Sequence, residues 1–114
     1  MDSTRTEEAR TRLTAERLRL LEEIGASVSL PEQMTYGSQA AAATQVFEQE
    51  RELAMRERAN VHLQAVDDAL ARLDGGTYGT CIRCGRPIAA ERLDALPWAT
   101  HCIECQTAVD RGQR

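Results

Sequence analysis

Apolar residues recur at near-heptad spacing along the first part of the chain, with arginine and glutamate filling the positions between them. Leu13, Leu20, Leu21 and Ile24 form this stripe. The spacing predicts an amphipathic helix over residues 4–24, because one face of the helix would be apolar and the others charged.

Both ends of this segment carry local signals. Thr4 and Glu7 have the spacing of a capping box, and Gly25 suits the position just after a last helical turn. Residues 25–38 contain glycine, proline and serine without a clear period. They therefore predict a loop, which would form the tip of any helical hairpin.

A second periodic segment extends from residue 39 to residue 73 without glycine or proline. It begins with a run of four alanines at 40–43, which favours helix. Its second half has an apolar seam formed by Leu63, Val66, Leu70 and Leu73. The sequence Asp74-Gly75-Gly76 follows and predicts a glycine C-cap, so we expect a helix of about 35 residues.

Each of these helices needs a partner to bury its apolar stripe. The pattern predicts a mainly α fold in which an antiparallel two-helix coiled-coil hairpin occupies residues 1–74. A small separate module is expected over residues 75–114. Because the second helix is the longer one, residues 39–52 should extend beyond the end of the first.

Four cysteines in the C-terminal module form two C-x-x-C pairs, Cys81 with Cys84 and Cys102 with Cys105. Each pair can curl so that both sulfurs reach one ion, and the intervening stretch is long enough to complete a tetrahedron. The spacing predicts one structural Zn²⁺ with no coordination position left open for a reacting water. A short terminal helix should begin within the second pair, over residues 104–111.

Two disulfides, or a thioredoxin-like redox pair, are the alternatives for these cysteines. Disulfides form in oxidising compartments, but the N-terminus leads into a charged periodic segment rather than an apolar signal region. No βαβ pattern surrounds either pair, as a redox motif would require. His101, beside Cys102, could replace one thiolate as a ligand. Free cysteines and the absence of an export signal predict a cytoplasmic protein, and no apolar run is long enough to span a membrane.

The charge distribution restricts the classes of partner. The net charge is -4, and residues 1–74 hold 14 acidic residues against 9 arginines. This balance argues against a protein that wraps duplex DNA through phosphate contacts. In the C-terminal module, Arg83, Arg86 and Arg92 are either solvated or contact an acidic protein surface or a nucleotide phosphate. No catalytic constellation is present in the sequence, so we expect no enzyme.

The residues around the cysteines resemble the zinc-finger signature of the DksA/TraR family, and the segment from Thr44 to Leu53 is similar to the second-helix segment of its shorter members. The resemblance covers roughly residues 38–106. Its motifs are Gly76-Thr77-Tyr78-Gly79, Pro87-Ile88, Glu91-Arg92-Leu93, Ala95-Leu96-Pro97 and Ile103-Glu104. The family implies a coiled-coil finger on a four-cysteine zinc base. It also implies a transcription factor that binds RNA polymerase directly by inserting the finger into the secondary channel.

One departure from the family concerns the finger tip. DksA carries an Asp-x-x-Asp-x-Ala motif there, and counting back from Cys81 places those positions at Ser38, Ala41 and Ala43. The alanine is present, whereas both carboxylates are absent. Docking could therefore persist while the regulatory output differs. The family also implies joint action with an alarmone of the guanosine tetraphosphate type. Whether this protein binds such an alarmone is left open. The residues expected to meet a partner at the tip are Ser38, Gln39, Ala41, Ala42 and Ala43.

Three binding functions remain in competition on the sequence alone. The first is a regulator that docks in the secondary channel of RNA polymerase. The second is a zinc-stapled structural or adaptor protein that binds another cytosolic assembly. The third is a zinc-ribbon nucleic-acid binder, which the acidic charge disfavours, so sequence-specific DNA binding is not expected.

Overall fold

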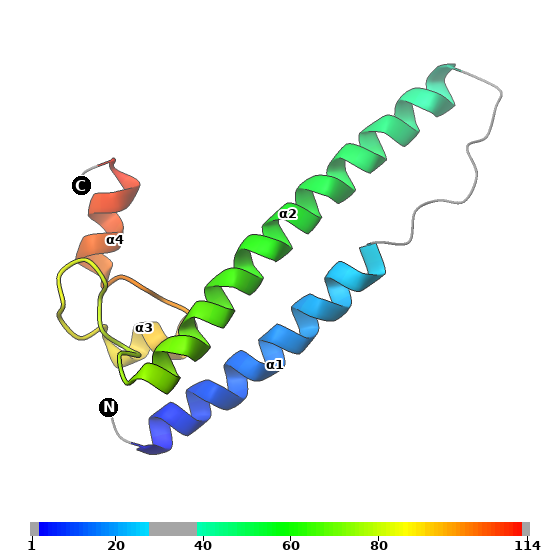
Figure 1. The fold of residues 1–114 in the computed structure, drawn as a ribbon. Helices are drawn as coiled ribbons and strands as arrows, with labels where there is room; N and C mark the ends of the chain where they lie inside the picture. Colours follow the sequence, from blue (N-terminus) through cyan, green and yellow to red (C-terminus); the bar gives the residue numbers. More distant parts are fainter. Residues whose placement is uncertain (1–2, 28–38, 113–114) are drawn as a thin grey trace. The chain divides into compact units, whose positions relative to one another are not determined.

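The structure is a computed structural model that describes residues 3–27 and 39–112 (Figure 1). Two long helices are followed by two short ones: α1 (Ser3–Ser27), α2 (Gln39–Gly75), α3 (Ala90–Ala95) and α4 (Ile103–Asp110). The only β-type pairing among the described residues is an isolated bridge between Thr80 and Pro87. The prediction of a mainly α fold is confirmed. Within the described ranges, none of the helices combines the length and apolar character that crossing a membrane requires.

The bounds of α1 correct the predicted ones at both ends. The helix begins at Ser3 rather than Thr4, and it continues through Gly25 to Ser27. Glycine lowers helix stability by about 1 kcal/mol relative to alanine, but helical backbone angles are open to it. A glycine ends a helix only where the chain adopts a left-handed conformation, and Gly25 does not have a positive φ. The predicted loop at 25–38 is thereby shortened, and residues 28–38 lie outside the described part of the chain.

α2 begins at Gln39, as predicted, and ends two residues later than expected, at Gly75. Gly76 then takes a left-handed φ of 80°. The amide of Thr77 donates to the carbonyl of Arg72 at 2.9 Å, and the amide of Gly76 donates to that of Leu73 at 3.4 Å. This pair of bonds is a Schellman motif, which satisfies the last carbonyls of the helix.

The Cα positions group the chain into two compact units, residues 1–17 with 65–114, and residues 18–64. Each long helix therefore contributes to both units. The predicted division into domains at 1–74 and 75–114 instead separates the periodic helical segments from the cysteine-containing module. This division stays a prediction.

The first unit joins the N-terminal half of α1 to the C-terminal end of α2. Leu13 and Val66 are completely buried there. Arg17 Nε donates to Asp67 Oδ1 at 2.7 Å, and Arg10 Nη1 lies 2.9 Å from Asp74 Oδ1. Because residue numbers rise on one helix as they fall on the other, the two helices run antiparallel. These ion pairs are partly exposed, so each is expected to contribute about 1 kcal/mol or less.

The same unit contains the C-terminal module. Apart from Tyr78, its apolar core consists of small and medium-sized side chains, which matches the low aromatic content of the chain. α1 also reaches α3 through Arg5 Nη1 and Asp94 Oδ1, 3.9 Å apart. The buried apolar residues of this module are Tyr78, Ile88, Leu93 and Ala99.

The second unit is sparsely packed. Leu20 and Ala59 are buried. None of the described side chains between residues 41 and 58 is fully buried. Phe47 is 72% exposed and Leu53 is 60% exposed. The described N-terminal part of α2 therefore contributes no fully buried side chain.

Candidate metal centre

The first C-x-x-C pair is held in a tight turn. The amide of Cys81 donates to the carbonyl of Arg86 at 2.8 Å, and the amide of Gly85 donates to the carbonyl of Cys81 at 3.0 Å. Gly85 has a φ of 76°, which a residue with a side chain rarely adopts. The glycine thus lets the chain reverse immediately after Cys84, so that both sulfurs of the pair can face the same point.

The second pair lies at the start of α4. Cys102 is the N-cap of this helix and Cys105 is in its first turn. The two pairs are tied together by the amide of Ile82, which donates to the carbonyl of Thr100 at 2.9 Å. The predicted terminal helix at 104–111 is therefore present, displaced by one residue, and it begins within the second pair as expected.

All four sulfurs converge. The Sγ atoms of the four cysteines lie within 4.8 Å of one another, and Cys84 Sγ is 3.8 Å from Cys102 Sγ. A tetrahedral zinc site with Zn–S bonds of about 2.3 Å has sulfurs about 3.8 Å apart. The donor set and its spacing therefore fit Zn²⁺. A disulfide, at about 2.05 Å, would require the sulfurs to be much closer.

The burial of the cluster is uneven. Cys81 and Cys105 are buried, Cys102 is half-buried and Cys84 is exposed. A four-thiolate zinc site is closed to substrate, because the protein occupies every coordination position. The partly exposed edge at Cys84 gives the ion a route in and out, while the arrangement supplies cross-linking rather than catalysis.

The thiols influence one another's ionisation. Burial tends to raise the pKa of Cys81, yet hydrogen bonds from the backbone of Cys84, Cys102 and Arg83 and from the Cys105 side chain lower it to about 5. The Arg83 side chain tends to lower the pKa of Cys105, but burial and the three neighbouring cysteines raise it to about 11. One thiol of the cluster therefore releases its proton readily while another retains it. A divalent cation would remove this conflict by neutralising the thiolates together.

His101 is not part of the cluster. The metal-capable group found among the described residues contains the four cysteines alone. His101 Nδ1 instead lies 2.8 Å from Thr100 Oγ1. The histidine is thus engaged locally, and the four-cysteine set needs no substitute ligand.

The three arginines predicted to meet a partner have different surroundings. Arg83 and Arg86 are exposed. Arg92 is half-buried, and its Nε donates to the backbone carbonyl of His101 at 2.9 Å. This bond joins α3 to the segment before Cys102, so Arg92 has a structural role whether or not it also contacts a partner. That contact stays a prediction for all three.

The predicted tip residues lie at the start of α2. Ala42 and Ala43 are exposed and Ala41 is half-buried. Gln39 is the first residue of the helix, and Ser38 lies outside the described residues. They belong to residues 18–64, whereas the cysteines belong to the other compact unit.

Comparisons with known proteins agree with this zinc module. Residues 76–111 match the family model described as "Prokaryotic dksA/traR C4-type zinc finger". The chain is 40% identical over 63 residues to the RNA polymerase-binding transcription factor DksA of Caulobacter vibrioides, a match that covers 55% of this chain and 44% of that protein. The chain thus spans less than half the length of this curated relative.

Solved structures extend the similarity beyond the zinc module. The Chlamydia trachomatis regulator Dks shares the fold, with a TM-score of 0.62 at 20% identity over 98% of this chain and 94% of that chain. DksA2 from Pseudomonas aeruginosa has a TM-score of 0.83 and 30% identity, over 97% of this chain and 87% of that chain. Since this similarity covers almost the whole of both chains, the protein belongs to the DksA/TraR family of C4-type zinc-finger proteins.

Proposed function

We propose that the protein is a non-enzymatic transcription regulator that binds RNA polymerase directly and acts in the cytoplasm. The observation that supports this most strongly is the similarity to the transcription factor DksA2, which extends through the helical hairpin as well as the zinc module. The acidic net charge of -4 suits a protein-binding regulator better than one that binds DNA phosphates.

The zinc ion has a structural role in this proposal. Cys81, Cys84, Cys102 and Cys105 are the proposed ligands, supported by the mutual distances of at most 4.8 Å. When bound, the ion supplies a cross-link between the turn after Thr80 and the start of α4. The residues of the chain then hold Arg83 and Arg86 at the surface of a fixed module, where they can meet an acidic partner.

The hairpin tip would enter the secondary channel of the polymerase. The small exposed side chains at the start of α2, Ala42 and Ala43, leave this part of the helix narrow. Without the carboxylates of the DksA motif, the tip lacks negative charge at positions 38 and 41. We therefore propose that docking is retained and that the effect on transcription differs from that of DksA.

The proposal is tested by site-specific photocrosslinking to core RNA polymerase. A photoreactive amino acid replaces Ala42, and a matched variant carries it at Glu104 on α4. Crosslinks from position 42 should map to the secondary channel, and those from position 104 should map elsewhere on the polymerase. Efficient binding without any channel crosslink from position 42 would contradict the docking mode, and absence of binding would contradict the function.

A structural or adaptor role is the second candidate, and the exposure of Phe47 and Leu53 on α2 favours it specifically. Such apolar side chains can pack against a partner helix that is not part of the polymerase. Initiation assays at several promoters with saturating protein separate the two functions. Unchanged initiation at all of them, together with no polymerase binding, would favour the adaptor.

A further inference from the structure

Cys102 is a metal ligand that burial alone does not fix. Cys81 and Cys105 are buried, whereas Cys102 is half-buried. It is the N-cap of α4, with an extended backbone at φ −67° and ψ 167°, and its side chain makes no cap hydrogen bond. The position of its sulfur therefore depends on the backbone that immediately precedes it.

Hydrogen bonds from two other parts of the chain reach this preceding backbone. The amide of Ile82 donates to the carbonyl of Thr100 at 2.9 Å, which links the two cysteine pairs through their main chains. Arg92 Nε donates to the carbonyl of His101 at 2.9 Å. The second bond comes from a side chain, so a substitution can remove it while the main chain stays intact.

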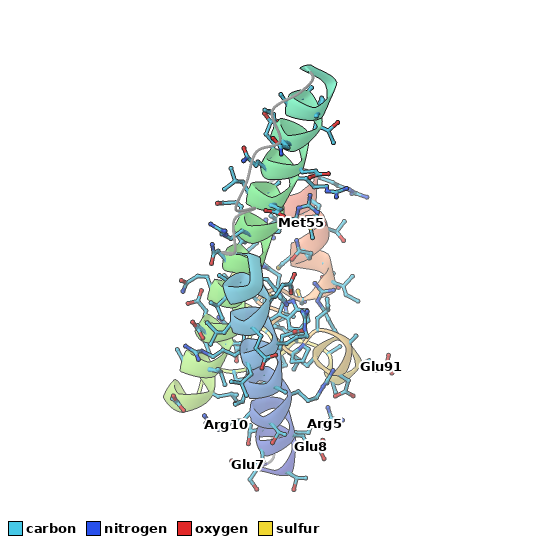
Figure 2. All side chains as sticks on the ribbon, turned by 90° about the vertical axis from the view of Figure 1, so that its right-hand side faces the viewer. Arg5, Glu7, Glu8, Arg10, Met55 and Glu91 are labelled. Atoms are coloured by element: carbon cyan, nitrogen blue, oxygen red, sulfur yellow. The ribbon has the colours of Figure 1, made fainter. Side chains whose placement is uncertain are left out.

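The short helix α3 presents Arg92 to this carbonyl. The next residue, Leu93, is only 4% exposed and anchors the helix in the core of the module. Arg92 is half-buried, whereas the residue before it, Glu91, is exposed and projects outward from α3 (Figure 2). A hydrogen bond from a charged donor is stronger than one from a neutral donor. The anchored helix and the guanidinium together make this a firm contact.

The carbonyl that accepts from Arg92 belongs to the peptide group between His101 and Cys102. Fixing this peptide group restricts the backbone of Cys102, and hence the directions that its Sγ atom can take. That atom lies 3.8 Å from Cys84 Sγ, which is about the separation that a tetrahedral zinc site requires. Outer groups that orient metal ligands raise the affinity, because less ordering remains to be done when the metal binds.

We propose that Arg92 is a positioning residue for the zinc centre, which raises the affinity for Zn²⁺ by holding the His101 carbonyl and thereby directing Cys102. Arg92 acts through the ligand and needs no contact with the ion. The role extends the metal centre to α3, which contributes none of the four cysteines. This inference rests on the proposed ligation by the cysteines and is independent of binding to RNA polymerase.

The zinc affinity of the full-length protein tests the proposal, measured by competition with a chromophoric chelator. Arg92→Met removes the donors but keeps an unbranched side chain for packing. It should weaken zinc binding about tenfold or more, as loss of an outer contact to a metal ligand typically does. A bond that stabilised the metal-free and zinc-loaded protein equally would leave the affinity unchanged, so unchanged affinity would overturn the proposal.

Arg86→Met is the matched control, because it removes one positive charge from an exposed position in the same module. It should weaken zinc binding much less than Arg92→Met. Equal weakening by the two variants would show a general charge effect and would contradict a positioning role.

Arg92→Lys separates the donor from the geometry, because it keeps a charged donor but loses the rigid guanidinium plane. Its zinc affinity should lie between those of the unsubstituted protein and Arg92→Met, and an affinity no higher than that of Arg92→Met would overturn the proposal. Comparison of Arg92→Lys with Arg86→Lys carries the same test if Arg92→Met does not fold. The unsubstituted protein should hold one zinc per chain, and its absence would contradict the cysteine ligation on which the inference rests.

Discussion

At the scale of single residues, the metal centre is assigned from the four cysteines. Their sulfurs converge, as the spacing of the two C-x-x-C pairs in the sequence predicts. Sequence reasoning reached them because a C-x-x-C pair closes on itself locally, so that two ligands are fixed by a few residues. Tyr78 was noticed only as part of a motif. Its buried hydroxyl depends on which atoms of α1 and α3 surround it, and no local pattern encodes that.

Removal of the zinc tests the structural role of the four cysteines. Chelation, or Cys81→Ser, should expose residues 76–110 to proteolysis, because this module has few large apolar side chains to hold it together. Much of the helical circular dichroism should remain, since α1 and α2 bury a stripe of their own. A protease-resistant C-terminal module in the metal-free protein would contradict this expectation.

Leu13 is the residue whose truncation should affect stability most clearly. It is completely buried against the antiparallel helix pair. Leu13→Ala should lower the free energy of unfolding by about 2–4 kcal/mol, through lost burial and the cavity left behind. Val61→Ala is the control, because Val61 is 63% exposed and its truncation should cost less than about 0.5 kcal/mol. Urea denaturation compares the two, and similar losses would show that Leu13 is not a core residue.

At the scale of elements, the existence of the helices was more predictable than their ends. Period and propensity place α1 and α2 correctly, because a long amphipathic segment admits few other structures. The predicted C-terminal end of α1 was wrong, because a glycine such as Gly25 is compatible with a helix end but does not require one. α3 was missed because its six residues are too few to show a period. The hydrogen bond from Arg92 to the carbonyl of His101 helps to hold this helix in place.

Two adjacent glycines at the end of α2 should respond to alanine in opposite directions. Gly76 has a left-handed φ of 80°, which strains any residue with a Cβ. Gly76→Ala should therefore destabilise the protein by about 1 kcal/mol. Gly75 is helical and has open space where a Cβ would lie, so Gly75→Ala should stabilise by about 0.4–1 kcal/mol. Thermal denaturation measures both, and the same sign for the two variants would contradict the Schellman assignment.

At the scale of the whole molecule, the fold and the charge of the tip have separable consequences. The long helices and the zinc module are those of the family, and the proposed docking would use both. The tip differs in one chemical respect, which is the loss of negative charge at two positions of the motif. Affinity for polymerase and effect on transcription should therefore be separable by substitution at the tip alone.

The variant Ser38→Asp/Ala41→Asp tests this separation. It should still bind core RNA polymerase, because DksA carries carboxylates at these two tip positions and binds the polymerase. It should, however, change initiation in a reconstituted assay, since the proposed docking mode would bring the two added carboxylates near the polymerase active site. Ala42→Asp is the matched control, because the next residue points about 100° away around the helix. An equal effect of the control on initiation would mean that general acidity acts, and no effect of the double variant would mean that these positions do not reach the active site.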